Sequence, residues 1–230
     1  MNKTIEEMKN PKTPKAQETR EKIFRTALEM FKEKGFEKVT MREIAKACNM
    51  AVGAAYYYFK TKEDIVFEFY LHTQQEHEEE TQKIFKESKD VQERISKTIT
   101  IKLEQFAPYR SMLSALFKIA GDPGHRLSPF SNESKKVREE AIDIFRHAIE
   151  GSNLKMRGEI RNYLPHLFWL YQMGIILFWI HDRSENQKQS LLLLKNSLKI
   201  IFQLIRLSRI PGLKKIKQSA IELLNQTKLN

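Results

Sequence analysis

The residues best suited to chemistry in this chain are three consecutive tyrosines, Tyr56, Tyr57 and Tyr58, which follow the small residues Gly53 and Ala54. Tyrosine hydroxyls suit phosphate oxygens, and their flat rings suit sugars or thymine methyl groups. Glycine and alanine let another backbone approach closely. Neighbouring residues on a helix lie about 100° apart, so three successive tyrosines cannot all face inward. The pattern therefore predicts an exposed surface suited to nucleic acid.

A capped helix and a tight turn are predicted just before this surface. Thr40 and Glu43 form a Thr-x-x-Glu capping box, so a helix is expected to begin at Met41. Asn49 tolerates the left-handed backbone that ends a helix, and the chain is expected to turn there.

The turn is followed by a second short helix and the start of a third. Val52, Ala55 and Phe59 recur at helical spacing and are expected to form the buried face of the second helix. Thr61 and Asp64 give another capping signal, which predicts that a third helix begins there.

This stretch resembles the DNA-binding domain of the tetracycline-repressor (TetR) family. The family pattern is Thr before Ile-Ala, a turn, Gly, Tyr, an aromatic pair ending in Phe, and Lys-Glu. The matching residues are Thr40, Ile44, Ala45, Gly53, Tyr56, Tyr58, Phe59, Lys62 and Glu63. The resemblance runs from near Ala16 to near Glu76. It departs from the family at Ala51, which lacks the turn hydroxyl that commonly touches a phosphate.

The motif and the charge together predict which residues meet DNA. Phosphate contacts are expected from Thr40, Tyr56 and Lys62, with Lys60 as a further candidate. The groove-facing candidates are Arg42, Val52, Gly53, Ala54 and Tyr57. Phosphate contacts supply salt-dependent affinity, so the few groove-facing side chains would set the sequence preference.

The composition also favours a polyanionic partner. The chain of 230 residues has 40 Lys and Arg against 29 acidic residues, a net charge of +11. Residues 1–62 hold 14 basic and 8 acidic residues, which gives +6 in about a quarter of the length. The single cysteine, Cys48, excludes an internal disulfide and is expected to be a small apolar filler.

The whole chain reads as all-α, and no segment has the pattern of a strand. We expect an N-terminal three-helix helix-turn-helix DNA-binding domain and a larger C-terminal helical bundle for ligand binding and dimerisation. The predicted parts are a flexible arm at 1–15, the DNA-binding domain with its connecting helix at 16–76, the regulatory and dimerisation domain at 77–210, and a basic amphipathic tail helix at 211–230.

No signal peptide is visible at the N-terminus, and a cytoplasmic protein without membrane contact is expected. The apolar run at 164–180 is short for a membrane-spanning helix and contains Pro165, His166, Gln172 and Gly174. A buried helix is therefore the preferred interpretation of this run, with a membrane span as the alternative.

The TetR resemblance implies a pocket for an apolar effector in the C-terminal bundle. TetR-type regulators hold an effector there, and its binding shifts the connecting helix and respaces two recognition helices. Gln172 and Tyr109 are the expected polar groups of the pocket. The ligand-binding candidates are Phe106, Tyr109, Met112, Phe117, Phe168, Tyr171, Gln172 and Phe178. For any one aromatic among them, core packing is the alternative.

Dimerisation is expected because one recognition helix reads few base pairs. Two copies on a palindrome would place half-sites about 34 to 36 Å apart, or a multiple of that distance. The two late apolar helices are the predicted interface, and burial inside their own bundle is the alternative. The interface candidates are Gly174, Leu194, Leu198, Ile201 and Ile205, with Phe178 beside them.

No catalytic residues, metal site or cofactor is predicted, because the six histidines lack metal-binding spacing and no phosphate loop or nucleophile elbow is present. The sequence thus predicts a ligand-responsive transcriptional regulator, most simply a repressor, whose partners are double-stranded operator DNA, an apolar effector and a second copy of the chain. The alternatives are a DNA-compacting protein without sequence preference, and a helical carrier of apolar ligands or an enzyme that has kept a vestigial N-terminal unit.

Overall fold

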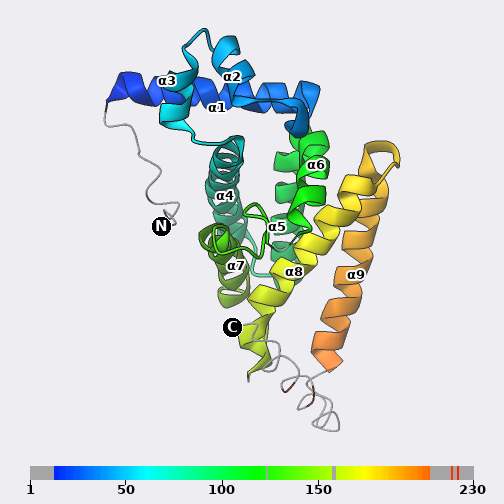
Figure 1. The fold of residues 1–230 in the computed structure, drawn as a ribbon. Coiled ribbons are helices and arrows are strands. Elements are labelled where there is room, and N and C mark those ends of the chain that lie inside the picture. Colours follow the sequence, from blue (N-terminus) through cyan, green and yellow to red (C-terminus); the bar gives the residue numbers. More distant parts are fainter. Residues whose placement is uncertain (1–12, 123, 157–158, 208–218, 220–221, 223–230) are drawn as a thin grey trace. The chain divides into compact units, whose positions relative to one another are not determined.

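The structure of the protein is a computed structural model, which describes residues 13–122, 124–156, 159–207, 219 and 222 (Figure 1). These residues form helices, turns and loops, and none of them lies in a strand. The predicted all-α fold is therefore confirmed. The α-helices are α1 (Pro14–Lys34), α2 (Met41–Ala47), α3 (Val52–Tyr58), α4 (Lys62–Glu87), α5 (Val91–Phe106), α6 (Arg110–Ala120), α7 (Lys135–Glu150), α8 (Ile160–His181) and α9 (Lys188–Leu207). The 3-10 helices are η2 (Phe36–Lys38), η3 (Ala107–Tyr109) and η4 (Glu185–Gln187).

The chain divides into two compact units, each made of two segments. The first unit takes Met1–Gln74 and Phe106–Arg138, and the second takes Gln75–Gln105 and Glu139–Asn230. The predicted domain boundary between residues 76 and 77 lies close to the first boundary between the two units, which falls between Gln74 and Gln75. The grouping of residues 106–138 with the N-terminal helices was not predicted from the sequence.

Helix α1 begins and ends at residues that cap it. The Thr13 hydroxyl accepts a hydrogen bond from the backbone N–H of Ala16 at 3.3 Å, so the helix begins inside the predicted arm of residues 1–15. Gly35 ends it with φ of +84°, in the left-handed region that glycine adopts readily. The Phe36 ring then meets Phe31 edge to face at 5.1 Å. The remainder of the predicted arm and nearly all of the predicted tail at 211–230 lie outside the described residues.

The second unit has an aromatic core between its last three helices. Phe168 of α8 stacks on Phe145 of α7, with ring centroids 6.2 Å apart, and on Phe202 of α9 at 5.8 Å. Arg94 of α5 joins the helix ends, because its guanidinium donates to the carbonyls of Ser88 at 2.6 Å and Ala148 at 3.3 Å. These contacts pack α7, α8 and α9 around one interior.

Helix α8 contains the apolar run at 164–180, for which the sequence allowed either a buried helix or a membrane-spanning helix. Among the described residues it is the one helix long and apolar enough to cross a membrane, and 56% of its most apolar window is buried inside the protein. A core helix of a folded domain meets the same criterion. Burial of Phe168, Trp169, Gln172 and Trp179 gives this helix the core role that the sequence predicted.

Candidate nucleic-acid interface

The predicted helix-turn-helix is present in the first unit, where α2 packs against both α1 and α3 (Figure 1). The capping box that opens α2 is complete. The N–H of Glu43 donates to the Thr40 hydroxyl at 3.3 Å, and the Glu43 carboxylate accepts from the N–H of Thr40 at 2.9 Å. Asn49 has φ of +55°, so the left-handed turn between the two helices lies where it was predicted.

Helix α3 divides into an anchoring face and an exposed face. Ala55 and the C-capping Phe59 are buried, whereas Tyr57 is 64% exposed and Tyr56 is also exposed. Val52 was predicted both for the buried face and for the groove. Val52 is 36% exposed, so the prediction that it is buried is wrong. Its side chain is exposed to solvent, as Tyr56 and Tyr57 are.

The start of α3 presents little side-chain bulk. Gly53 and Ala54 are both exposed. A Cβ built at Gly53 would have no atom within 4 Å outside its immediate neighbours, so the protein's own packing does not require glycine there. The small residues therefore leave open space beside the tyrosines, as close approach to a DNA groove would require.

Three of the remaining DNA-binding candidates are exposed, but they differ in whether their polar groups already form hydrogen bonds within the protein. Arg42 and Lys60 are exposed. The Thr40 hydroxyl is exposed too, but it already donates to the Glu43 carboxylate at 2.8 Å as part of the cap. A phosphate contact from each of these three residues stays a prediction.

Lys62 has a structural role that the sequence did not reveal. Its ammonium donates to the carbonyls of Phe36 at 2.8 Å, Glu37 at 3.3 Å and Val39 at 3.3 Å, and it lies over the Phe36 ring at 4.3 Å from the centroid. These carbonyls lead directly to the start of α2. The predicted phosphate contact is untested, and the observed contacts hold the first turn of α4 against the helix-turn-helix.

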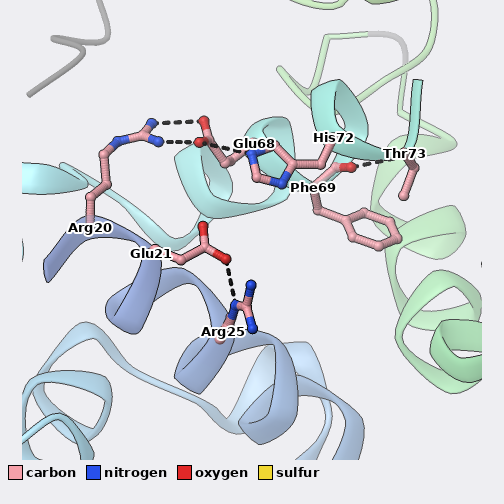
Figure 2. A network of polar contacts seen from close by, with 7 residues as sticks. All are labelled: Arg20, Glu21, Arg25, Glu68, Phe69, His72 and Thr73. Atoms are coloured by element: carbon pink, nitrogen blue, oxygen red, sulfur yellow. Dashed lines mark hydrogen bonds and ion pairs between the residues drawn. The ribbon is translucent and has the colours of Figure 1, made fainter. Parts of the chain in front are cut away.

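A part-buried ion pair between Arg20 and Glu68 fastens α1 to α4 (Figure 2). Both oxygens of the Glu68 carboxylate are bound by the Arg20 guanidinium, whose carbon also lies 4.7 Å from the centroid of the Phe59 ring. His72, one turn further along α4, lies 3.5 Å from the same carboxylate. Arg20 therefore links three helices of the first unit, and the sequence analysis did not identify it.

The neighbours of Glu68 control its charge. Burial alone would raise the pKa of this carboxyl, but the hydrogen bonds and charges of His72 and Arg20 outweigh burial and lower the pKa to about 2. In return, the hydrogen bond to Glu68 raises the pKa of His72. The carboxylate stays ionised at neutral pH and keeps the α1–α4 contact intact.

The predicted effector-pocket residues are distributed over both units. In the first unit, the rings of Phe106 and Tyr109 lie 6.0 and 4.7 Å from the Phe69 ring, Met112 is buried and Phe117 is half-buried. A pocket that includes both sets of residues stays a prediction.

In the second unit, the candidates differ in burial. Phe168 and Gln172 are buried, and the Tyr171 hydroxyl lies 2.6 Å from the Ser197 hydroxyl. Phe178 is exposed, which does not suit a residue that lines an interior pocket. Among the described residues, the Gln172 side-chain oxygen has no hydrogen-bond partner.

The predicted dimer residues lie on the expected helices, but most face inward. Leu194, Leu198 and Ile205 are buried within the second unit and Ile201 is half-buried, so the structure differs from the prediction here. The reason is that α9 is apolar on more than one face, and helical spacing alone does not tell which face its own bundle covers. The apolar residues that α8 and α9 do expose are Leu177, Phe178, Leu191, Leu192, Leu193, Ile200 and Leu204.

No group of three or more His, Cys, Asp or Glu side chains that could hold a metal ion occurs in the part of the chain that the structure describes. The single cysteine, Cys48, is buried at the end of α2.

The fold and the exposed face of α3 define a helix-turn-helix protein with an appended helical unit. The family described as bacterial regulatory proteins, tetR family, matches residues 23–69, and the tetracyclin repressor-like C-terminal domain matches residues 94–223. The chain belongs to the TetR family. The predicted helix-turn-helix domain with a C-terminal helical domain is thereby confirmed.

Curated relatives match through the N-terminal region. The transcriptional regulator AcrR of Shigella flexneri is 42% identical over 55 residues, which are 24% of this chain and 26% of AcrR. UidR of Escherichia coli strain K12 is 37% identical over 60 residues, 26% of this chain and 31% of UidR. The matched part spans less than a third of either relative.

Solved structures share the fold over most of the chain. The TetR regulator of Nitrosomonas europaea has a TM-score of 0.61 at 20% identity, covering 79% of this chain and 96% of that one. FadR of Thermus thermophilus, a TetR family repressor solved in complex with lauroyl-CoA, has a TM-score of 0.58 at 21% identity, covering 78% of this chain and 92% of FadR. At these identities the likeness is one of fold.

Proposed function

We propose that this protein is a cytoplasmic transcriptional repressor that binds palindromic operator DNA as a homodimer and is released by a small apolar effector. The observation that carries the proposal is the exposed face of α3. Buried Ala55 and Phe59 anchor this helix from behind, and its outward side combines small residues with Tyr56 and Tyr57. This arrangement leaves a face narrow enough to enter a groove, with tyrosine hydroxyl groups available to bind a duplex.

The exposed apolar residues of α8 and α9 support the dimer. Leu193, Ile200 and Leu204 recur at i, i+7 and i+11, so they share one face of α9. On α8, Leu177 and Phe178 are exposed, and a Cβ at the nearby Gly174 would meet no atom within 4 Å. A second copy would cover these side chains, and two related helices could approach closely at the glycine.

The apolar effector is supported by the interior of the second unit. Gln172 lies in the stretch of α8 that also buries Phe168 and Ile175, and its buried side-chain oxygen has no described partner. A ligand with a hydrogen-bond donor on an apolar body would satisfy that oxygen. The lauroyl-CoA bound by the Thermus FadR shows that a protein of this fold can hold a long apolar chain.

Selection of DNA from a random duplex library tests the proposal. The expected result is enrichment of a two-fold symmetric sequence, with an affinity that falls steeply as the salt concentration rises. Equal affinity for random and enriched duplexes would support a compacting protein instead. The absence of any salt-sensitive DNA binding would refute the proposal and favour a carrier.

The dimer is tested by light scattering on two matched variants. Ile200→Glu puts a charge on the exposed face of α9 and is expected to give monomers. The control is Phe130→Glu, because Phe130 is similarly exposed, 62% against 56% for Ile200, but lies in the loop between α6 and α7. A dimer that survives the first change as well as the second would contradict the proposed interface.

A further inference from the structure

The first turn of α4 is the point in the first unit where the helix-turn-helix joins the following helix. Three residues, 59–61, separate α3 from α4. The turn is closed by a reciprocal cap, in which the N–H of Asp64 donates to the Thr61 hydroxyl at 3.2 Å and the N–H of Thr61 donates to the Asp64 carboxylate at 3.0 Å. Because the connection is this short, a rotation of the first turn of α4 would also change the orientation of α3.

Two cations hold this turn, one of which is Lys62. Its ammonium binds the carbonyls of η2 and Val39, immediately before the Thr40 cap of α2. Lys62 therefore fixes the beginning of the helix-turn-helix relative to α4.

The second cation, Arg126, comes from the loop between α6 and α7. Its guanidinium pairs with Asp64 at 3.0 Å, donates to the Thr61 hydroxyl at 3.2 Å, and lies over the Phe67 ring at 5.4 Å from the centroid. It thus binds both residues of the cap and one ring in the next turn of α4. The Asp64 side chain is buried, so it gains more from the contact than an exposed carboxylate would.

The loop that carries Arg126 is itself held by buried hydroxyl groups. The Ser131 hydroxyl donates to the carbonyl of Arg126 at 2.8 Å, and the Ser134 hydroxyl donates to the carbonyl of Ser128 at 2.7 Å. All three serines are buried. Helix α7 begins directly after this loop at Lys135 and runs to Glu150, so the chain leads without a break from the Arg126 contact into the second unit.

We infer that Arg126 is a positioning residue for DNA binding. By fixing Thr61 and Asp64, it holds the first turn of α4 in the orientation from which Lys62 supports α2 and the short connection supports α3. Loss of the Arg126 contact frees this turn and lowers the fraction of molecules whose α3 is oriented for DNA. The inference rests on the proposed DNA-binding function.

Affinity for the duplex selected by the wild-type chain tests the inference. Arg126→Gln is expected to weaken binding about fivefold, a loss in the range of one partly exposed charge-assisted contact. Arg126→Lys keeps the pairing with Asp64 and is expected to recover part of the loss. The matched control is Arg146→Gln on α7, which removes the same charge together with an ion pair to Asp143 of the same helix. It is expected to bind within about twofold of wild type.

Asp64→Asn separates positioning from simple electrostatics. Asparagine keeps a carbonyl oxygen that can cap α4, but it loses the charge that Arg126 binds. Removing a negative charge near DNA would by itself strengthen binding. If Arg126 acts by positioning, Asp64→Asn should instead weaken DNA binding about fivefold. The double variant Asp64→Asn with Arg126→Gln should then bind DNA no more weakly than either single variant.

Amide hydrogen exchange of the free protein gives a readout that needs no DNA. Exchange at residues 62–66 is expected to become faster in Arg126→Gln and to stay at the wild-type rate in Arg146→Gln. Wild-type affinity and exchange in Arg126→Gln would overturn the inference while leaving the proposed function standing. A wild-type chain that selects no duplex would overturn the proposed function and the inference with it.

Discussion

The Arg20–Glu68 ion pair gives a prediction whose size can be worked out from the structure. Glu68 is 8% exposed, and the pKa of its carboxyl lies at about 2, against an ordinary value of 4.5. A carboxyl whose pKa is lower in the folded chain binds protons more readily after unfolding. Its contribution to stability is therefore complete above about pH 4.5, and it is lost as the pH falls towards the folded-state pKa.

The size of this contribution follows from the difference between the two pKa values. A shift from 4.5 to about 2 corresponds to up to about 3 kcal/mol of unfolding free energy at neutral pH. Glu68→Gln removes that contribution and leaves the half-buried Arg20 without its charge partner. We expect a loss of roughly 2 to 3 kcal/mol at pH 7, and a smaller difference from wild type at acid pH.

Urea unfolding followed by circular dichroism, between pH 7 and about pH 3, measures both effects. The matched control is Glu21→Gln, which breaks the Glu21–Arg25 pair on the exposed side of α1 (Figure 2). This pair is solvent-exposed, so the control is expected to lose less than about 1 kcal/mol. A Glu68→Gln curve that runs parallel to wild type over the whole pH range, or a control that is equally destabilised, would show that the Glu68 charge does not stabilise the fold.

Three further changes test other parts of the structure. Lys62→Met removes the donor to the carbonyls of η2 and Val39, and thermal unfolding should show a loss of about 1 to 2 kcal/mol even without DNA. Asn49→Val places a β-branched residue at φ of +55° and should cost about 1 to 2 kcal/mol in the same assay, whereas Asn49→Gly should be tolerated. Gln172→Leu replaces a buried oxygen without a described partner, so urea unfolding should show unchanged or slightly raised stability while effector release of DNA is lost. Wild-type stability in Lys62→Met or Asn49→Val, or full effector response in Gln172→Leu, would contradict these expectations.

The features that the sequence predicted best depend on residues a few positions apart. The Thr40–Glu43 box, the Thr61–Asp64 cap and the left-handed Asn49 are all local signals, and each is present in the structure. Such signals are readable because both partners lie within one turn of the chain.

The features that were missed depend on partners far apart in sequence. Lys62 binds carbonyls 23 to 26 residues earlier, and Arg126 reaches a hydroxyl 65 residues earlier. Residue spacing does not reveal contacts between residues far apart in sequence, so Lys62 was interpreted only as a phosphate ligand. Charge and exposure at the surface could not reveal that its ammonium already has three acceptors.

The predicted dimer residues show a related limit. Leu194 and Ile200 belong to the same apolar helix, but the first is buried in its own unit and the second is exposed. A helix with apolar residues on several faces fits a core and an interface equally well, and only the positions of its neighbours decide which face remains uncovered. Spacing along the sequence therefore could not tell which apolar residues of α9 are exposed.

Photocrosslinking can establish whether the exposed face of α3 enters a DNA groove, as we propose. A selected duplex in which thymines are replaced by 5-iodouracil would be irradiated with the protein, and the crosslinked residues identified by mass spectrometry. We expect crosslinks at Tyr56 or Tyr57, which are exposed on α3. Crosslinks confined to residues outside α2, α3 and the first turn of α4, from a duplex that is tightly bound, would contradict this proposal.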